Sequence, residues 1–180
     1  MQYYVPLIPQ LTSMGCWAAS IAMVQSWATQ TCISPGTIAA RDGYQDKLAT
    51  GLAPSDDKIL RDWGFVTENP ACYTVAGFMQ LVQQYGPLWV ACLVGGGAHV
   101  RVVTGFDPDP DPSLATVYIN DPWQTGMTTF TLPNSGSSYT QTYIAFTNQQ
   151  DSLGSQELSE PSPVYVAHLA SRAFAPDVSN

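Results

Sequence analysis

Charged side chains are scarce in this chain of 180 residues. They make up 11% of the sequence, and only six of them are basic, against fourteen that are acidic. The formal net charge is therefore −8. Nucleic acids and anionic membrane surfaces are bound through clusters of Lys and Arg, so the shortage of basic residues argues against both partners. The sequence also lacks an apolar run of about 18 residues, which a membrane-spanning helix would need.

Cysteine is sparse too, and no segment of the chain repeats. Four cysteines are too few for a scaffold held together by disulfides, and their spacing is not that of paired zinc ligands. We therefore expect neither a metal nor a cofactor, while a disulfide between Cys32 and Cys72 stays open, as does any pairing with Cys92. The first residues lack the basic and apolar regions of a secretory signal. We expect a protein that is secreted or delivered into a target cell without a classical signal peptide, and that is otherwise cytoplasmic.

Hydrophobic residues make up 45% of the chain, which is enough for one packed domain. Local patterns predict helices in the first half and strands in the second, and this order favours an α+β fold with an antiparallel sheet. We assign residues 1–147 to this domain and residues 148–180 to a peripheral tail with a short helix near 164–173. The predicted helices are 16–28, one starting at Ser34-Pro35, 55–64 and 74–85, and the predicted strands are 88–94, 100–106, 115–120, 127–132 and 140–146.

Cys16 begins the first predicted helix, which carries no charged residue and should therefore be buried. The N-terminus of a helix favours the thiolate form of a cysteine, and the thiolate is the nucleophile. A buried structural cysteine would also fit this position. Cys16 is thus a candidate nucleophile that needs support from other residues.

Three further positions supply the residue types that a thiol nucleophile needs. His99 begins a predicted strand, which could hold a general base rigidly. Asn120 and Asp121 end the next strand, and because neighbouring residues point to opposite faces, only one of them can orient His99. Gln10 lies six residues before Cys16. Its amide and the Cys16 backbone N–H could both donate to a developing oxyanion.

The order Gln10, Cys16, His99, Asp121 resembles that of the papain-like cysteine peptidases, in which an aromatic residue follows the nucleophile as Trp17 does here. The resemblance extends over most of the chain. It is strongest to the compact bacterial branch, which includes effector proteases injected by plant pathogens. The family implies a helical half packed on an antiparallel sheet, with the active site between them.

The resemblance also implies a role for each of the four residues. Cys16 would attack a carbonyl, His99 would carry the proton, Asp121 would orient His99, and Gln10 would stabilise the oxyanion. Substrate contacts are expected at three positions near these residues in the sequence, namely Trp17, Gly97 and Trp123.

Two features depart from the family's pattern. His99 follows Cys16 by 83 residues, whereas roughly 130–150 residues separate nucleophile and histidine in papain. Ser13 stands where papain's signature has a cysteine ahead of the nucleophile. The loops that shape the substrate pockets must therefore be reduced, and the family's specificity does not carry over.

These features predict a thiol peptidase that cleaves a protein or peptide substrate through an acyl-enzyme. The same thiol and histidine also serve glutamine deamidases, transglutaminases, cell-wall peptide amidases and double-glycine leader peptidases, and the sequence does not separate these. A non-catalytic binding module is the third alternative. The resemblance to injected proteases predicts a bacterial effector or toxin, which would have an immunity or chaperone protein as its partner.

Overall fold

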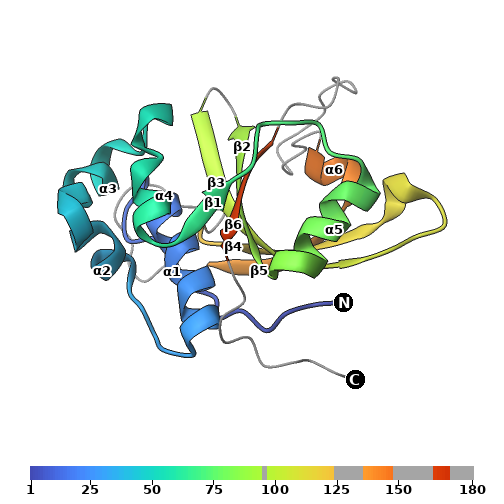
Figure 1. Cartoon of the computed structure of the whole chain (residues 1–180), viewed down its shortest axis with the longest axis horizontal. Coiled ribbons are helices and arrows are strands. Elements are labelled where there is room, and N and C mark those ends of the chain that lie inside the picture. The colour runs from blue at the N-terminus through green and yellow to red at the C-terminus, as the bar shows by residue number, and fades with distance from the viewer. Residues whose placement is uncertain (95–96, 124–135, 148–163, 171–180) are drawn as a thin grey trace.

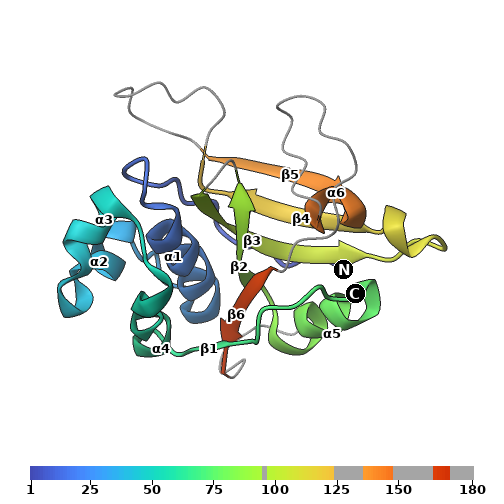
Figure 2. The ribbon, with the colours of Figure 1, turned by 90° about the horizontal axis from the view of Figure 1, so that it is seen from above.

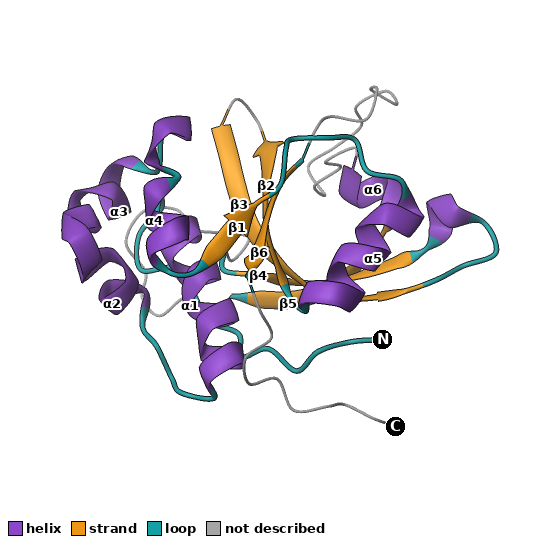
Figure 3. Ribbon diagram, viewed as in Figure 1, coloured by secondary structure: helices purple, strands orange, loops and turns teal. Residues whose placement is uncertain are grey.

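The structure is a computed structural model, and it describes residues 1–94, 97–123, 136–147 and 164–170. A single sheet runs through the middle of the molecule, with α1 to α4 on one side and α5 and α6 on the other (Figures 1 and 3). The helices are α1 (Cys16–Thr29), α2 (Pro35–Ala40), α3 (Lys47–Thr50), α4 (Lys58–Asp62), α5 (Val75–Tyr85) and α6 (Tyr143–Thr147), with 3-10 turns at Arg41–Asp46, Pro54–Asp56 and Pro112–Leu114.

The sheet is antiparallel throughout, with the strand order β1-β6-β2-β3-β4-β5. The view from above shows it separating the helical half from α5 (Figure 2). The predicted α+β class is therefore confirmed, together with the first helix and the strand over 88–94. The strands are β1 (Phe65–Thr67), β2 (Leu88–Val94), β3 (Gly97–Asp107), β4 (Thr116–Asp121), β5 (Ser137–Thr142) and β6 (Tyr165–Leu169).

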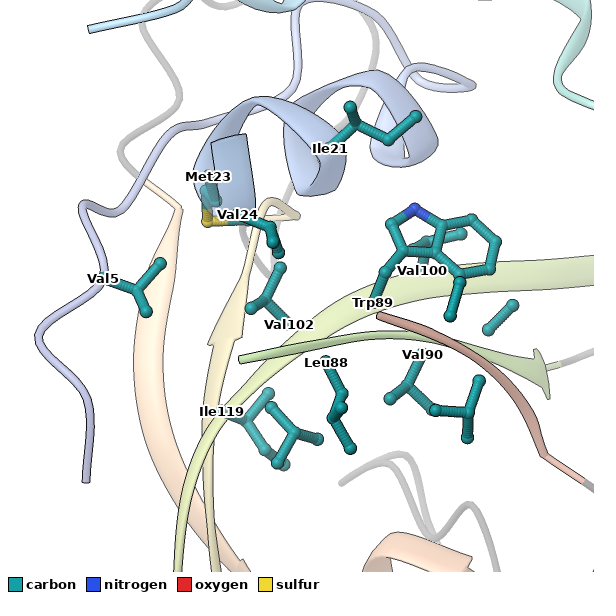
Figure 4. Close-up of a cluster of buried hydrophobic side chains, with 14 of the residues drawn as sticks. Val5, Ile21, Met23, Val24, Leu88, Trp89, Val90, Val100, Val102 and Ile119 are labelled. Carbon is teal, nitrogen blue, oxygen red and sulfur yellow. The ribbon is translucent and has the colours of Figure 1, made fainter. Parts of the chain in front are cut away.

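Helix α1 is the centre of the helical half. It buries every residue from 16 to 27, as its lack of charge predicts. Figure 4 shows Ile21 and Val24 of α1 facing the central strands. They pack in the same core cluster as Trp89 of β2 and Val102 of β3. Trp89 and Val102 lie opposite each other in the sheet and share a face. This packing fixes α1, and with it Cys16, against the two central strands.

The opposite face of the sheet is covered by α5 and by an aromatic cluster. Thr74 accepts a hydrogen bond from the Gly77 N–H and so caps α5. Phe78 of α5 is fully buried and contacts three aromatic rings that come from β3 and α6. These rings, at centroid distances of 5.5 to 6.3 Å from Phe78, belong to Phe106, Tyr143 and Phe146.

The prediction of a peripheral C-terminal tail is wrong for β6. This strand lies inside the sheet, between β1 and β2, and is paired with both. The short helix predicted over 164–173 is therefore a strand instead. Four consecutive residues of this strand, from Val166 to Leu169, are buried, and a strand buried on both faces shows no alternation to reveal it.

His168 anchors β6 to its surroundings. The ring stacks on Tyr85 of α5 at a centroid distance of 3.5 Å, and its Nε2 lies 3.0 Å from Oε1 of Glu68. Nδ1 lies 3.0 Å from the Leu169 carbonyl oxygen. The second histidine of the chain thus belongs to the core of the sheet, with only 2% of its surface exposed.

The remaining predictions of strands are only partly confirmed. The strand predicted over 140–146 ends at Thr142 and continues as α6, so that its second half is helical. The strand predicted over 127–132 lies outside the described residues. Strand β1 is only three residues long and was not predicted, because such a short segment carries no periodicity.

No helix in the described part of the chain is long and apolar enough to cross a membrane. The four cysteines all lie within the described ranges, and none forms a disulfide. Cys32 and Cys72 are exposed, whereas Cys16 and Cys92 are buried. The alternative of a Cys32–Cys72 bridge is therefore not realised in this structure.

The position of β6 gives a stability prediction. Val166 is 2% exposed within this strand, so we expect Val166→Ala to lower the free energy of unfolding by about 2 kcal/mol, from lost burial and the cavity left behind. Its neighbour Tyr165 is 48% exposed, and Tyr165→Ala should cost less than about 1 kcal/mol. Urea unfolding followed by tryptophan fluorescence measures both. Equal effects of the two substitutions would contradict the placement of β6 in the sheet.

Candidate active site

Cys16 is the first residue of α1 and lies at the boundary between the two halves of the molecule. The helix begins after Gly15, whose backbone N–H donates to the Thr12 carbonyl at 3.1 Å. No side chain caps this helix end, so its unpaired N–H groups are left for another acceptor. A negative charge on the Cys16 sulfur is stabilised at this position by the helix dipole. The residue is 8% exposed, which leaves the sulfur at the edge of the core rather than inside it.

His99 and Asp121 come together at the ends of neighbouring strands. His99 lies near the start of β3, and Asp121 is the last residue of β4. Nε2 of His99 lies 2.8 Å from Oδ1 of Asp121. The carboxylate is the acceptor, so Nε2 carries a proton, and the other ring nitrogen, Nδ1, is left for Cys16.

Asp121, and not Asn120, is the residue whose side chain is hydrogen-bonded to His99. Asn120 lies opposite Val102 in the sheet, so alternation places Asp121 and His99 together on the other face. The Asn120 amide donates to the Val5 carbonyl at 3.0 Å. Its Oδ1 accepts from the Ser138 hydroxyl at 2.7 Å. The choice that the sequence left open is thus decided by strand register.

The charges around His99 favour its protonated form. Burial lowers the pKa of His99, but hydrogen bonds to Asp121 and to Cys16, with the negative charges of both, outweigh burial and raise it to about 9. At neutral pH the ring is therefore an imidazolium. The protonated ring is a proton donor next to the Cys16 side chain.

Gln10 is held against the same region by its backbone and by its side chain. Its N–H donates to the Pro122 carbonyl at 3.2 Å, which ties the N-terminal segment to the end of β4. Its Nε2 donates to the Thr12 carbonyl at 2.7 Å. The side chain is 1% exposed, although it is polar. The orientation of the Gln10 amide is therefore set by the protein and not by bulk water.

The three predicted substrate contacts differ in their surroundings. The ring of Trp123 lies edge-on to that of His99, with the ring centroids 6.2 Å apart. The backbone N–H of Trp123 donates to Asp121 Oδ1 at 2.8 Å. Gly97 begins β3, two residues before His99. Trp17, by contrast, is 1% exposed, with its Nε1 on the Lys47 carbonyl. The ring of Trp17 is part of the core, and its contact with substrate stays a prediction.

Two backbone groups that hold the site together could not be predicted from the residue pattern. The Pro122 carbonyl receives the Gln10 N–H, and the Trp123 N–H reaches the Asp121 carboxylate. Backbone groups are common to all residues, so only the fold reveals which of them meet. Among the described residues, no group of three or more His, Cys, Asp or Glu side chains could hold a metal ion.

Comparisons with known proteins agree with this geometry. The family model described as papain-like cysteine protease AvrRpt2 matches residues 1–142. A search of curated proteins found no match. Among solved structures, the chain is similar to the peptidase domain of Streptococcus ComA, a bifunctional ABC transporter involved in quorum sensing, with a TM-score of 0.58 and 15% identity. The similarity covers 92% of this chain and 99% of that one.

The family match spans most of the chain, so the protein belongs to the papain-like cysteine proteases of the AvrRpt2 family. It is a cysteine peptidase. The likeness to the ComA domain independently supports the papain-like fold.

The raised pKa of His99 gives a prediction for the site. Part of the increase comes from the hydrogen bond to Cys16 and the charge of its thiolate. In Cys16→Ala both contributions are lost, so we expect the pKa of His99 to fall below the value of about 9 in the parent protein. A titration followed by NMR of the imidazole resonances measures it, and His168 is the only other histidine to assign. An unchanged pKa of His99 would show that the two side chains do not interact.

Proposed function

We propose that the protein cleaves a peptide bond in a protein substrate through an acyl-enzyme, with Cys16 as nucleophile, His99 as acid and base, and Asp121 as the residue that orients His99. One observation carries this proposal. His99 is hydrogen-bonded to Asp121 at 2.8 Å on one side and to Cys16 on the other. This arrangement meets the requirement that a nucleophile contact its base and that the base be oriented by a third group.

Acylation uses the charged pair directly. The Cys16 thiolate attacks the substrate carbonyl carbon and forms a C–S bond, while the carbonyl π electrons move onto oxygen. When the tetrahedral intermediate collapses, the C–N bond breaks and His99 Nδ1 gives its proton to the leaving amine. The result is a thioester on Cys16, a neutral His99 and a free amine.

Deacylation restores the pair. Neutral His99 takes a proton from water as the water oxygen attacks the thioester carbon. The C–S bond then breaks, the acid product leaves, and Cys16 departs as a thiolate beside the protonated His99. Asp121 holds the imidazole orientation throughout by its hydrogen bond to Nε2.

Two donors are suited to the oxyanion that forms during each attack. One is the backbone N–H of Cys16 at the start of α1, and the other is the Nε2 amide of Gln10. Preorganised donors of this kind stabilise the transition state more than the substrate. Trp123 and Gly97 flank His99, so we assign them to contacts with the half of the substrate that leaves as an amine.

We further propose that the protein acts as a bacterial effector or toxin delivered into another cell. This proposal draws on the AvrRpt2 family name and on the resemblance to injected proteases. An immunity or chaperone protein would restrain it before delivery. The net charge of −8 suits a partner with a basic surface.

Mass spectrometry of peptide N-termini tests the reaction and the target together. Lysates of a bacterium and of a eukaryotic host are incubated with the protein, with Cys16→Ala as the matched inactive control. We expect new N-termini that appear only with active protein, and only in the lysate that holds the target. Glutamine residues converted to glutamate, without new termini, would show a deamidase that uses the same thiol. Equal numbers of new termini with Cys16→Ala would contradict the role of Cys16.

The pH dependence of activity tests Asp121. Since His99 must be protonated to release the amine, kcat/KM should fall above about pH 9. In Asp121→Asn the amide oxygen still faces His99, but the negative charge is gone. The pKa of His99 therefore drops, and the alkaline limb of the profile moves to lower pH. The prediction fails if the alkaline limb stays near pH 9 in the variant.

A further inference from the structure

Thr12 connects three parts of the active site through two of its own atoms. Its carbonyl oxygen accepts the Gln10 Nε2–H at 2.7 Å and the Gly15 N–H at 3.1 Å. Its hydroxyl donates to the carbonyl of Leu48 in α3. One residue thus joins the glutamine amide, the residue that caps the nucleophile helix and the helical half of the domain.

The Gln10 amide depends on this contact for its orientation. Nε2 carries two hydrogens, and one of them is donated to the Thr12 carbonyl. Oε1 is buried and has no hydrogen-bond partner among the described residues. Because the side chain is 1% exposed, bulk water cannot orient it instead. The Thr12 carbonyl therefore sets the rotation of the amide, and the second Nε2 hydrogen is left for the substrate.

The hydroxyl of Thr12 fixes where that carbonyl lies. It is bonded to α3, whose Lys47 carbonyl accepts the Trp17 Nε1–H at 3.3 Å. The carbonyls of Lys47 and Leu48, which are consecutive in α3, thus bind Trp17 on one side of Cys16 and Thr12 on the other. The hydroxyl also lies directly against the cap residue, since a Cβ added to Gly15 would be 3.0 Å from Thr12 Oγ1. The loop has little freedom to shift while this bond is intact.

We propose that Thr12 is a positioning residue of the peptidase reaction. It does not touch the substrate. Its hydroxyl anchors the loop to α3, and its carbonyl aims the Gln10 amide at the oxyanion. The inference rests on the proposed role of Gln10 and adds the residue on which that role depends.

The test compares Thr12→Val, which keeps the branched shape, with Thr12→Ser, which keeps the hydroxyl. Thr12→Ala is a second variant without the hydroxyl and adds no bulk. We expect Thr12→Val and Thr12→Ala to lower kcat about tenfold with little change in KM, since removal of an oxyanion donor itself costs about 10²–10³ in kcat. Thr12→Ser should restore kcat. The rate of Cys16 alkylation by iodoacetamide should stay at the parent value, because the contact between Cys16 and His99 is intact.

Thr29→Val is the matched control. Thr29 is the last residue of the same helix, its hydroxyl donates to the Gln25 carbonyl at 2.8 Å, and it lies about 20 Å from Cys16 along the helix. This substitution should leave kcat unchanged. The double variant Gln10→Ala with Thr12→Val should be no slower than Gln10→Ala alone, since the proposed effect of Thr12 on kcat is exerted through the Gln10 amide.

Three results would overturn the inference. The first is a kcat of Thr12→Val and Thr12→Ala within twofold of the parent. The second is a further tenfold loss when Thr12→Val is added to Gln10→Ala, and the third is a parallel fall in the alkylation rate, which would reveal a loosened nucleophile loop. The proposed function fails separately, if the parent protein has no peptidase activity that Cys16→Ala removes.

Discussion

The chemistry that we propose for this protein depends on one contact across its two halves, the contact between His99 on β3 and Cys16 at the start of α1. Neither residue is reactive by position alone. The helix end supplies a place for a negative sulfur, and the sheet supplies an imidazole that Asp121 holds at 2.8 Å and keeps protonated, with a pKa of about 9. The arrangement requires that α1 stay fixed against β2 and β3, and the buried, uncharged surface of the helix provides that.

The loop between Gln10 and Cys16 joins these halves a second time. It is bonded to the end of β4 through the Pro122 carbonyl and to α3 through the Thr12 hydroxyl. The proposed oxyanion donors and the proposed nucleophile are therefore carried by one short segment that both halves restrain. A site of this kind is preorganised by hydrogen bonds to the backbone, which do not depend on the identity of the accepting residue.

Much of this could be predicted from sequence, and the failures have physical causes. Cys16, His99 and Asp121 stand at ends of regular elements, where residue type and spacing are informative. The choice of Asp121 over Asn120 required the register of β4. Trp17 follows the nucleophile, yet its side chain points into the core. Strand β6 was mistaken for a helix because a short apolar run buried on both faces has no period that distinguishes the two.

The central claim is that Cys16 forms a covalent acyl-enzyme with the help of His99. Intact-mass spectrometry after rapid acid quenching of a reaction with a cleaved substrate tests it most directly. The account predicts a protein whose mass is increased by the N-terminal fragment of the substrate less one water, with the adduct mapped to Cys16 and absent in Cys16→Ala. Substrate cleavage that persists in Cys16→Ala, or an adduct mapped to Cys32, Cys72 or Cys92, would contradict it.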